Sequence, residues 1–305
     1  MRRSRRPLRW IRTNYRRLTG SGPFTQKTIF WIRNTATNDR RALTTDGESR
    51  HDYASRPESN TGWVTAQRAG LPAPPVARWS SDSKRILTHQ LDQRRVPEVH
   101  LIQSAHESGL RPKLWSFAYP FPGDTVARAA WWIFDAESGR ATPVAAPPVD
   151  AALAAPLEMD EAWWADSGGT TAYYIEHERG MKAWWLKAID AATGQVRTVA
   201  EERGPTLTEA TLHIGTKPNV HVTRDGKEVI WFSERDGFGH LYLLDAATGQ
   251  FKHQITKGPW VMRCWFGSMI GPERFGLSAR AGSRAEIRIS PTSIQWDSTA
   301  PASRS

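Results

Sequence analysis

The residues whose types and spacing could support chemistry are few. Glu176, His177 and Glu178 are consecutive, and neighbouring carboxylate and imidazole groups can bind a metal ion or transfer protons. Their surroundings favour a β-strand, in which adjacent side chains point to opposite faces, so the pattern separates the imidazole from the two carboxylates. The single cysteine, Cys264, excludes an internal disulfide and a cysteine-based zinc site of the usual kind. We therefore predict no metal site.

The motifs of the common enzyme classes are absent from the sequence. Hydrolysis by a serine nucleophile needs a Gly-x-Ser-x-Gly turn followed by Asp and His, so that a base activates the hydroxyl and backbone amides stabilise the oxyanion. The 305 residues contain no Gly-x-Ser-x-Gly, no His-Glu-x-x-His, no phosphate loop and no dinucleotide fingerprint. We predict that the chain is not an enzyme by itself and that it uses no cofactor.

The positive charge is concentrated at the N-terminus. The net charge is +10, and the first 50 residues hold 13 Lys and Arg against 3 Asp and Glu, whereas residues 51–305 hold 28 of each. A nucleic-acid-binding domain would carry its basic side chains on the folded part, so this distribution argues against one. No apolar run reaches the roughly 18 to 20 residues of a membrane span, and residues 1–18 have eight Arg but no apolar stretch of a signal peptide. We expect no nucleic-acid partner and no membrane span, and the compartment stays undetermined.

A short phrase that is repeated three times predicts which secondary-structure elements the chain is built from. Three copies of one short phrase follow β-rich runs, and their aspartates stand 55 residues apart both times. An Asp followed by Ser or Thr and Gly between two such runs predicts a strand, a tight turn and a second strand. The three copies are Phe134-Asp-Ala-Glu-Ser-Gly-Arg140, Ile189-Asp-Ala-Ala-Thr-Gly-Gln195 and Leu244-Asp-Ala-Ala-Thr-Gly-Gln250.

Further phrases complete a unit of four strands. Turns that open into strands occur at Trp79-Ser-Ser-Asp82, Trp164-Ala-Asp166 and Val222-Thr-Arg-Asp225, and closing phrases occur at residues 42–47 and 254–258. Four strands in about 50 to 55 residues is the length of a propeller blade. After residue 50 we expect no helix except a weakly helical stretch at Thr142 to Leu157. The sequence predicts an all-β fold, a partial β-propeller.

Pairs of tryptophan suggest an aromatic platform or cage, but a packing role is favoured. Adjacent residues of a strand face opposite sides, so one Trp of each pair can fill a blade while the other packs on the next blade. The pairs are Trp131-Trp132, Trp163-Trp164 and Trp184-Trp185.

An ordered series of phrases makes the fold assignment more specific. The motif residues are Trp79, Asp82, Asp92, Pro97, Arg111, Pro112, Tyr119, Pro120, Gly123 and Asp124. This series resembles the N-terminal propeller domain of the dipeptidyl peptidase IV branch of the prolyl oligopeptidase family, and the resemblance extends from about Leu43 to Gly267. It implies an eight-bladed propeller that caps an α/β-hydrolase domain, screens peptide substrates by size and helps to hold their N-termini. It also implies a serine peptidase as the parent, often exported or periplasmic, with homodimers in the family.

The chain departs from the family pattern in two places. Only 38 residues follow Gly267, fewer than the roughly 50 of a small domain, so we expect the hydrolase domain to be absent from this sequence. The family also places two Glu shortly before the Trp-Ser phrase, because two carboxylates can bind an α-ammonium group. Residues 63–78 contain no acidic side chain, which leaves Glu58 as a single candidate. Glu201 and Glu202 lie in another repeat, where we expect them to belong to a solvated turn. The substrate-binding residues therefore stay unknown.

The two ends lack blade phrases, which divides the chain into three parts. We predict an Arg-rich segment at 1–27, a propeller region at 28–267 and an irregular tail at 268–305. Reading plausible codons for residues 282–295 in a shifted frame gives a phrase of the family's next blade, so we hypothesise that the gene or its assembly carries frameshifts. An incomplete ring would expose apolar faces and strand edges, and we expect poor solubility. The alternative is a stand-alone propeller that acts as a protein-interaction scaffold.

Overall fold

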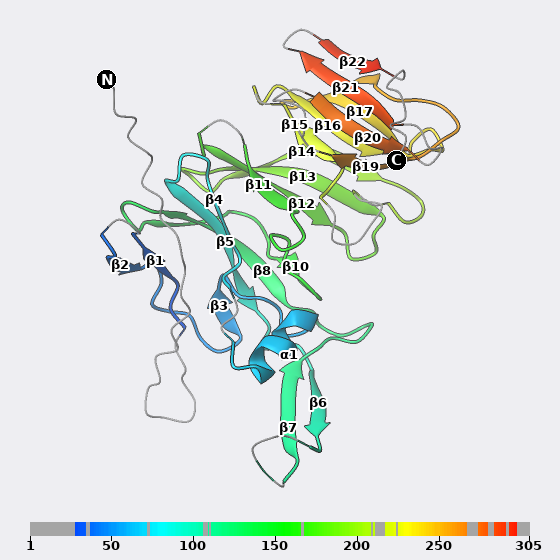
Figure 1. Cartoon of the computed structure of the whole chain (residues 1–305). Helices are drawn as coiled ribbons and strands as arrows, with labels where there is room; N and C mark the ends of the chain where they lie inside the picture. Colours follow the sequence, from blue (N-terminus) through cyan, green and yellow to red (C-terminus); the bar gives the residue numbers. More distant parts are fainter. Residues whose placement is uncertain are drawn as a thin grey trace. The chain divides into compact units, whose positions relative to one another are not determined.

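The computed structural model describes residues 28–34, 37–71, 74–105, 109, 111–165, 168–208, 210, 217–223 and 225–266, and the strands at 274–279, 284–290 and 293–297. The expected Arg-rich segment 1–27 lies outside the described residues. Within these ranges one helix forms, α1 (Thr61–Arg68), and it is too short to cross a membrane. All other regular elements are strands, which confirms the all-β prediction (Figure 1).

The strands, in chain order, are β1 (Trp31–Arg33), β2 (Arg40–Ala42), β3 (His51–Tyr53), β4 (Ala77–Trp79), β5 (Arg85–Asp92), β6 (Glu98–Gln103), β7 (Lys113–Ala118), β8 (Arg128–Asp135), β9 (Ala141–Pro143), β10 (Val149–Asp150), β11 (Ala162–Trp164), β12 (Thr171–His177), β13 (Ala183–Asp190), β14 (Val196–Arg203), β15 (Val220–Val222), β16 (Glu228–Ser233), β17 (His240–Asp245), β18 (Phe251–Gln254), β19 (Met262–Phe266), β20 (Arg274–Ala279), β21 (Arg284–Ser290) and β22 (Ser293–Asp297).

Three sheets have the simple meander of a propeller blade. Their strand orders are β11-β12-β13-β14, β15-β16-β17-β18 and β19-β20-β21-β22, and the pairings described for the last two are antiparallel. The chain forms two compact units, Met1–Tyr173 with Ile189–Val196 and Tyr174–Ala188 with Arg197–Ser305, and the division falls within the first of these sheets. These repeated four-stranded sheets match the partial propeller that the sequence predicts.

The sheet around β5 and β8 is a blade whose two edge strands are each split. Strands β3 and β4 both pair with β5, at its two ends, and β9 and β10 both pair with β8 in the same manner. Helix α1 lies in the connection between β3 and β4. Strands β5 and β8 pair without interruption from Arg85↔Asp135 to Asp92↔Arg128, so the central ladder of the sheet is continuous.

Each repeated Asp phrase forms the same turn. The Oδ1 atom of Asp190 accepts the backbone N–H of Ala192 at 3.0 Å, the N–H of Thr193 at 2.8 Å and the Thr193 hydroxyl at 2.8 Å. Asp135 and Asp245 make the corresponding three hydrogen bonds in their own turns. The hydrogen bonds from Thr193 are the main reason that the pKa of Asp190 lies below its ordinary value. The carboxylate therefore fixes the turn, and the predicted hairpins are confirmed.

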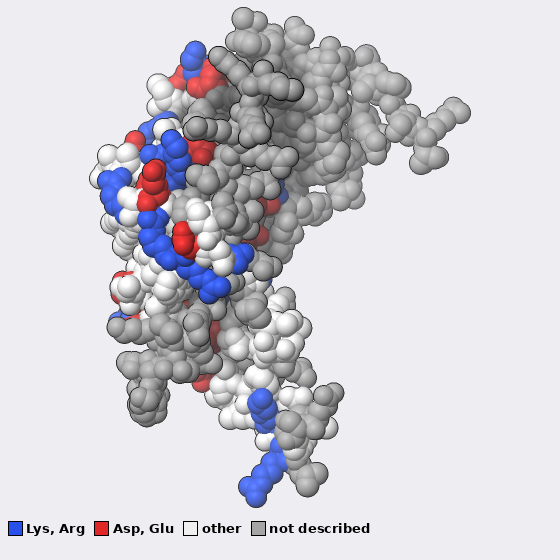
Figure 2. Space-filling view, turned by 60° about the vertical axis from the view of Figure 1, so that its left-hand side comes forward, with Lys and Arg blue, Asp and Glu red and all other residues white. Residues whose placement is uncertain are grey.

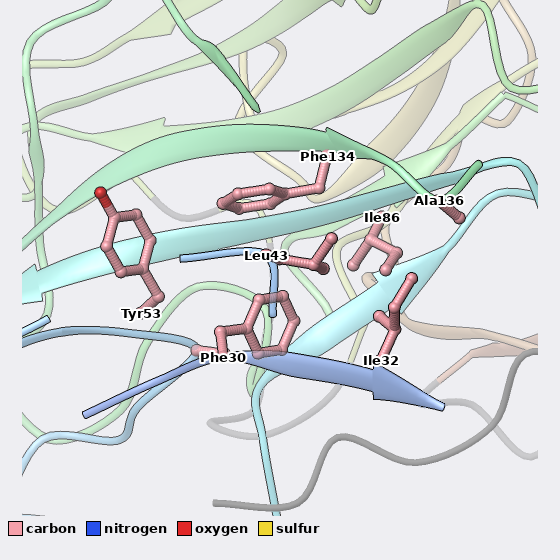
Figure 3. Close-up of a cluster of buried hydrophobic side chains, with 8 residues drawn as sticks. Phe30, Ile32, Leu43, Tyr53, Ile86, Phe134 and Ala136 are labelled. Atoms are coloured by element: carbon pink, nitrogen blue, oxygen red, sulfur yellow. The ribbon is translucent and has the colours of Figure 1, made fainter. Parts of the chain in front are cut away.

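Apolar clusters join neighbouring sheets. In the first unit Phe30, Ile32 and Leu43, from the hairpin β1–β2 and its flanks, pack against Ile86 and Phe134 of the split blade (Figure 3). The rings of Phe30 and Phe134 meet edge to face, with centroids 5.7 Å apart. In the second unit one cluster of buried side chains consists of Ile230, Phe232, Leu241, Leu243 and Met262. Because each sheet buries a face against its neighbour, stacking of blades supplies the core.

Tight joints connect the hairpin turns to the preceding sheet within each unit. Gly194 has φ +75°, and a Cβ built there would lie 2.2 Å from the carbonyl oxygen of Pro143 in β9. In the second unit Gly249 approaches the carbonyl oxygen of Val199 in the same way, at 2.6 Å. Arg197 adds a hydrogen bond of 2.8 Å to the carbonyl oxygen of Ala246. Gly194 and Gly249 of the repeated phrase are thus required for close approach as well as for the turn.

Three expectations need correction. Helix α1 forms because Asn60 caps its N-terminus, its side chain accepting the N–H of Gly62 at 2.9 Å, and the chain leaves it at Gly70 with φ +64°. Residues 142–157 are not helical but contain β9, β10 and turns, since their prolines lack the N–H that a helix uses. The tail 268–305 is not irregular throughout, because it contains strands β20 to β22. Apolar and polar residues alternate along 284–290, which is the sequence pattern that indicates the strand β21.

Candidate functional site at the base of an inserted hairpin

Most of the family motif residues surround a hairpin inserted into the split blade. Strands β6 and β7 come between β5 and β8 in the chain, but they pair only with each other among the described strands and extend away from the sheet (Figure 1). Asp92 and Pro97 lie on the chain that enters the hairpin, and residues 119–124 lie on the chain that leaves it. Arg111 and Pro112 lie at the start of β7, at the opposite end of the hairpin. The structure therefore brings part of the series together and separates the rest.

Asp92, Pro97 and Tyr119 close the base of this hairpin. The Asp92 carboxylate binds the Arg94 guanidinium through two hydrogen bonds of 2.9 and 2.6 Å, and this pair holds the pKa of Asp92 below its ordinary value. The N–H of Tyr119 donates to the carbonyl oxygen of Pro97 at 2.9 Å, the last backbone bond before the two segments part. These residues shape the entry and exit of the insertion.

The segment Tyr119-Pro-Phe-Pro-Gly123-Asp124 is a compact turn. Asp124 accepts the N–H of Phe121 through its side chain at 2.8 Å and donates its own N–H to the carbonyl oxygen of Phe121 at 3.0 Å. Gly123 has φ +95°, a conformation that other residues adopt at a cost. The tyrosine ring lies between Phe117 and Phe121, with centroids 6.2 and 6.1 Å away. Tyr119, Gly123 and Asp124 of the family motif thus each contribute to this turn or to its packing.

Trp79 and Asp82 belong to the turn between β4 and β5, away from the hairpin. Asp82 accepts the Ser80 hydroxyl at 2.6 Å and the N–H of Lys84 at 3.0 Å, which fixes the turn. Trp79 is half-buried and packs against the cluster shown in Figure 3. Both residues thus support the blade and lie on it as the repeated phrases predict.

Glu58, the single candidate for binding an ammonium group, is fully engaged by the protein. Its two oxygens accept hydrogen bonds from Nε and Nη2 of Arg50, at 3.1 and 2.9 Å, and Oε2 also accepts the N–H of Ala118 at 2.7 Å. The side chain is 13% exposed. Burial lowers the pKa of Arg50, but its bonds and charge interactions with Glu58 and Glu98 raise it overall. Sequence reasoning missed Arg50 because nothing local links it to residues 58 and 98.

A second carboxylate, that of Glu158, is bound by Arg56, which precedes Glu58 by two residues in the chain. Glu158 pairs with Arg56 at 3.0 Å and accepts the N–H of Ala155 at 2.9 Å. Burial raises the pKa of Glu158 above its ordinary value. Glu58 therefore pairs with Arg50, and Glu158 pairs with Arg56. Each glutamate is held by a different arginine of the protein.

The Glu201-Glu202 pair is divided between solvent and core. Glu202 accepts hydrogen bonds from the Trp231 indole at 2.9 Å, the Ser233 hydroxyl at 2.7 Å and the Arg235 guanidinium at 3.0 Å. Glu201 is exposed and pairs with Arg203 at 3.1 Å. The expectation of a solvated turn is wrong for both, since β14 extends through Arg203 and Glu202 is the acceptor that organises three side chains of the next sheet.

The Glu176-His177-Glu178 run does not form a metal cluster. Glu176 pairs with Lys187 at 3.6 Å and Glu178 with Arg203 at 3.9 Å, and both cations lie over the ring of Trp185. Among the residues that the structure describes, no group of three or more His, Cys, Asp or Glu could hold a metal ion. Glu176 and Glu178 therefore each form an ion pair next to Trp185.

One tryptophan of each pair is buried, as predicted. Trp131, Trp164 and Trp184 are 2%, 8% and 0% exposed, whereas their neighbours are half-buried. Trp184 stacks on Trp231, with ring centroids 3.9 Å apart. These tryptophans pack the blades and form no open aromatic cage.

Charged side chains of both signs are mixed on the described surface. In the face that Figure 2 shows, blue and red side chains lie next to one another over the sheets. This agrees with the balance of charge after residue 50. At the hairpin base the carboxylates of Glu58 and Asp92 bind arginine side chains and so position the segments that meet there.

Comparison with known proteins agrees with this description. The family model of the dipeptidyl peptidase IV N-terminal region matches residues 24–268. The structure is similar to dipeptidyl peptidase 4 of Porphyromonas gingivalis, with a TM-score of 0.62 and 17% identity over 89% of this chain and 37% of that chain. It is also similar to a putative dipeptidyl aminopeptidase IV from Bacteroides ovatus ATCC 8483, with a TM-score of 0.61 and 18% identity over 92% of this chain and 39% of that chain. This chain spans well under half the length of either.

At such identities the two solved structures establish the fold alone, and the family rests on the match to residues 24–268. That match covers the split blade, the inserted hairpin and the sheets of the second unit up to β19. It also covers every motif residue described above. The chain therefore belongs to the dipeptidyl peptidase IV N-terminal region family.

Proposed function

We propose that this chain is the non-catalytic propeller portion of a dipeptidyl peptidase IV-like serine peptidase. The observation that carries the proposal is the family match over residues 24–268, supported by the blade-like sheets. In this proposal the Ser-Asp-His triad lies outside the sequence, in an α/β-hydrolase domain that the propeller covers. The propeller limits access by size, so that unfolded peptides reach the triad and folded proteins do not.

The gene tests the first part of the proposal. Its DNA should be sequenced together with about 1.5 kilobases downstream, enough for further blades and a domain of roughly 250 residues. We expect a Gly-x-Ser-x-Gly turn followed by Asp and His in one of the three frames. A downstream region with no such frame would contradict the proposal and would favour a stand-alone scaffold.

The size-screening role is tested with the product of the intact reading frame. Its rate of hydrolysis should be measured on short peptides and on a folded protein that carries the same N-terminal sequence. We expect cleavage of the peptides only, and the variant with the nucleophilic Ser replaced by Ala controls for contaminating peptidases. Equal cleavage of the folded protein would refute size screening.

The proposal also concerns how a substrate N-terminus is held. Because the oxygens of Glu58 are occupied by Arg50 and Ala118, we propose that Glu58 does not bind the substrate ammonium group. The same intact enzyme should be assayed on free and N-acetylated peptides, as wild type and as Glu58→Gln. We expect the ratio of the two rates to be the same in both proteins. A ratio that falls toward one in the variant would assign the ammonium-binding role to Glu58.

A further inference from the structure

The inserted hairpin needs support from its base. Strands β6 and β7 pair only with each other among the described strands, and a two-stranded hairpin is marginally stable alone. Its outer half carries exposed apolar side chains, since Leu101, Ile102 and Leu114 are 47%, 70% and 62% exposed. The contacts that set its direction must therefore lie where it joins the blade.

Arg50 provides the central contact at that junction. It lies in the turn between Glu48 and His51, whose backbone groups bond to each other at 2.8 and 3.1 Å. Its φ of +60° is typical of Gly or Asn, so the backbone holds a conformation that an arginine adopts at a cost of order 1 kcal/mol. The turn directs the guanidinium to Glu58 and to Glu98, the first residue of β6, at 2.6 Å from its carboxylate.

Glu58 takes the place of a neighbouring strand at the edge of β7. Ala118, the last residue of β7, is opposite Glu98, and its N–H donates to Glu58 Oε2 at 2.7 Å. The same carboxylate binds Arg50 in a two-bond geometry, which is among the stronger ion-pair arrangements. One carboxylate thus connects the edge of the hairpin to the turn before β3.

Gln93 holds the two sides of this contact in register. It is 4% exposed and follows β5 directly. Its N–H donates to the carbonyl oxygen of Arg50 at 2.8 Å, and its side-chain oxygen accepts the N–H of Glu58 at 2.9 Å. The partners of the hairpin are therefore fixed to the blade by buried hydrogen bonds.

We propose that Arg50, Glu58 and Glu98 form a latch that fixes the hairpin β6–β7 to the split blade, and that opening the latch frees the hairpin while the blade stays folded. The blade does not need the hairpin, because β5 and β8 pair continuously without it. No described strand outside the hairpin pairs with β6 or β7, so the hairpin is joined to the rest of its unit at its base, by the latch and by the packing of Phe117 on Trp63 of α1, whose ring centroids lie 6.3 Å apart. The latch thereby sets the direction in which the apolar outer half is presented.

Hydrogen exchange of the full chain, resolved to single amides by mass spectrometry, tests the latch. In Glu58→Ala we expect exchange at the Ala118 amide to accelerate at least about tenfold, equivalent to about 1.4 kcal/mol of local stability. Amides within β6 and β7 should accelerate several-fold, and trypsin should cleave faster after the exposed Lys113. Amides of β5 and β8 should change less than about twofold. The matched control is Arg128→Ala, which removes an ion pair with Asp150 on the same blade without touching the hairpin.

Two results would overturn the proposal. The first is unchanged exchange across β6 and β7 in Glu58→Ala while the Ala118 amide alone accelerates, since the hairpin would then be held by other means. The second is equal acceleration in the Arg128→Ala control. If Glu58→Ala exposes the blade as well, Glu98→Ala decides, because it removes one bond to Arg50 from a side chain that is 38% exposed. Faster exchange in β6 with an unchanged β5 then supports the latch, and no change refutes it.

Discussion

Replacing Gly194 by Ala tests whether the hairpin turns are docked on the preceding sheet. Gly194 has φ +75°, and an added Cβ would lie 2.2 Å from the Pro143 carbonyl oxygen and 3.2 Å from Cγ2 of Thr142. Real Cβ atoms do not approach a backbone oxygen so closely, and a backbone atom cannot rotate away. The turn must therefore move off β9.

The magnitude follows from what that movement breaks. The left-handed conformation costs an alanine about 1 kcal/mol. Moving the turn lengthens the hydrogen bond from the Ala145 N–H to the Gly194 carbonyl oxygen, now 2.8 Å, and the bond from Arg140 to the Ala192 carbonyl oxygen, now 3.3 Å. At about 1 kcal/mol for each such bond, we expect Gly194→Ala to lower the free energy of unfolding by about 3 kcal/mol.

Gly168→Ala is the matched control. Its φ is +74°, but no atom lies within 4 Å of the added Cβ, so it carries the backbone cost alone, about 1 kcal/mol. Unfolding in urea, followed by tryptophan fluorescence, gives the free energies if the slope with denaturant is the same for all three proteins. Equal losses in Gly194→Ala and Gly168→Ala would refute the docking of the turn on β9.

Three further predictions concern single sites. Gly249→Ala should destabilise the second unit by about 2 to 3 kcal/mol, because its Cβ would lie 2.6 Å from the Val199 carbonyl oxygen. The control Gly226→Ala has the same φ of +71° but no atom near the added Cβ, so it should destabilise by only about 1 kcal/mol. Equal urea midpoints for the two variants would contradict this prediction. Glu202→Ala should lower the free energy of unfolding by about 3 kcal/mol, because three donors lose their acceptor. Glu201→Ala should lower it by less than about 0.5 kcal/mol. If urea unfolding shows the larger loss for Glu201→Ala, the roles assigned to the two residues are wrong. His89 is buried and donates through Nε2 to the Ser55 carbonyl oxygen at 2.8 Å; burial lowers its pKa from 6.5 to about 4. Between pH 6.5 and 4 this histidine is therefore protonated in the unfolded chain but neutral in the folded chain. As the pH falls from 6.5 to 4, the free energy of unfolding should decrease by about 3 kcal/mol. His89→Gln should flatten this part of the pH profile, and an unchanged slope would show that another group is responsible.

The sequence predicts best what depends on local chemistry. The aspartates at 135, 190 and 245 could be assigned to hairpin turns because each side chain bonds to the residues two and three positions after it. Alternation along a strand likewise predicts that one tryptophan of each pair is buried. These features need no knowledge of distant partners.

The rest depends on contacts between segments far apart in the chain. The association of Arg50 with Glu58 and Glu98 is produced by the folding of β5 and the hairpin, and no spacing rule indicates it. Nothing in the sequence distinguishes Glu202 from its neighbour Glu201, because the partners of Glu202 lie about thirty residues further on. Helix α1 has eight residues and no clear apolar period, so only its Asn60 cap and Gly70 could have indicated it.

The uninterrupted ladder between β5 and β8 has a consequence for how such a chain can diverge. Segment 93–127 leaves the sheet and returns to it, yet every pair from Arg85↔Asp135 to Asp92↔Arg128 is made. The entropic cost of closing a loop grows only by about 0.6 kcal/mol for each doubling of its length. Insertions, deletions and new surface side chains in this segment are therefore nearly neutral for the fold, provided the residues at its base are kept. The excursion is a position where relatives can acquire different outer surfaces on one unchanged blade.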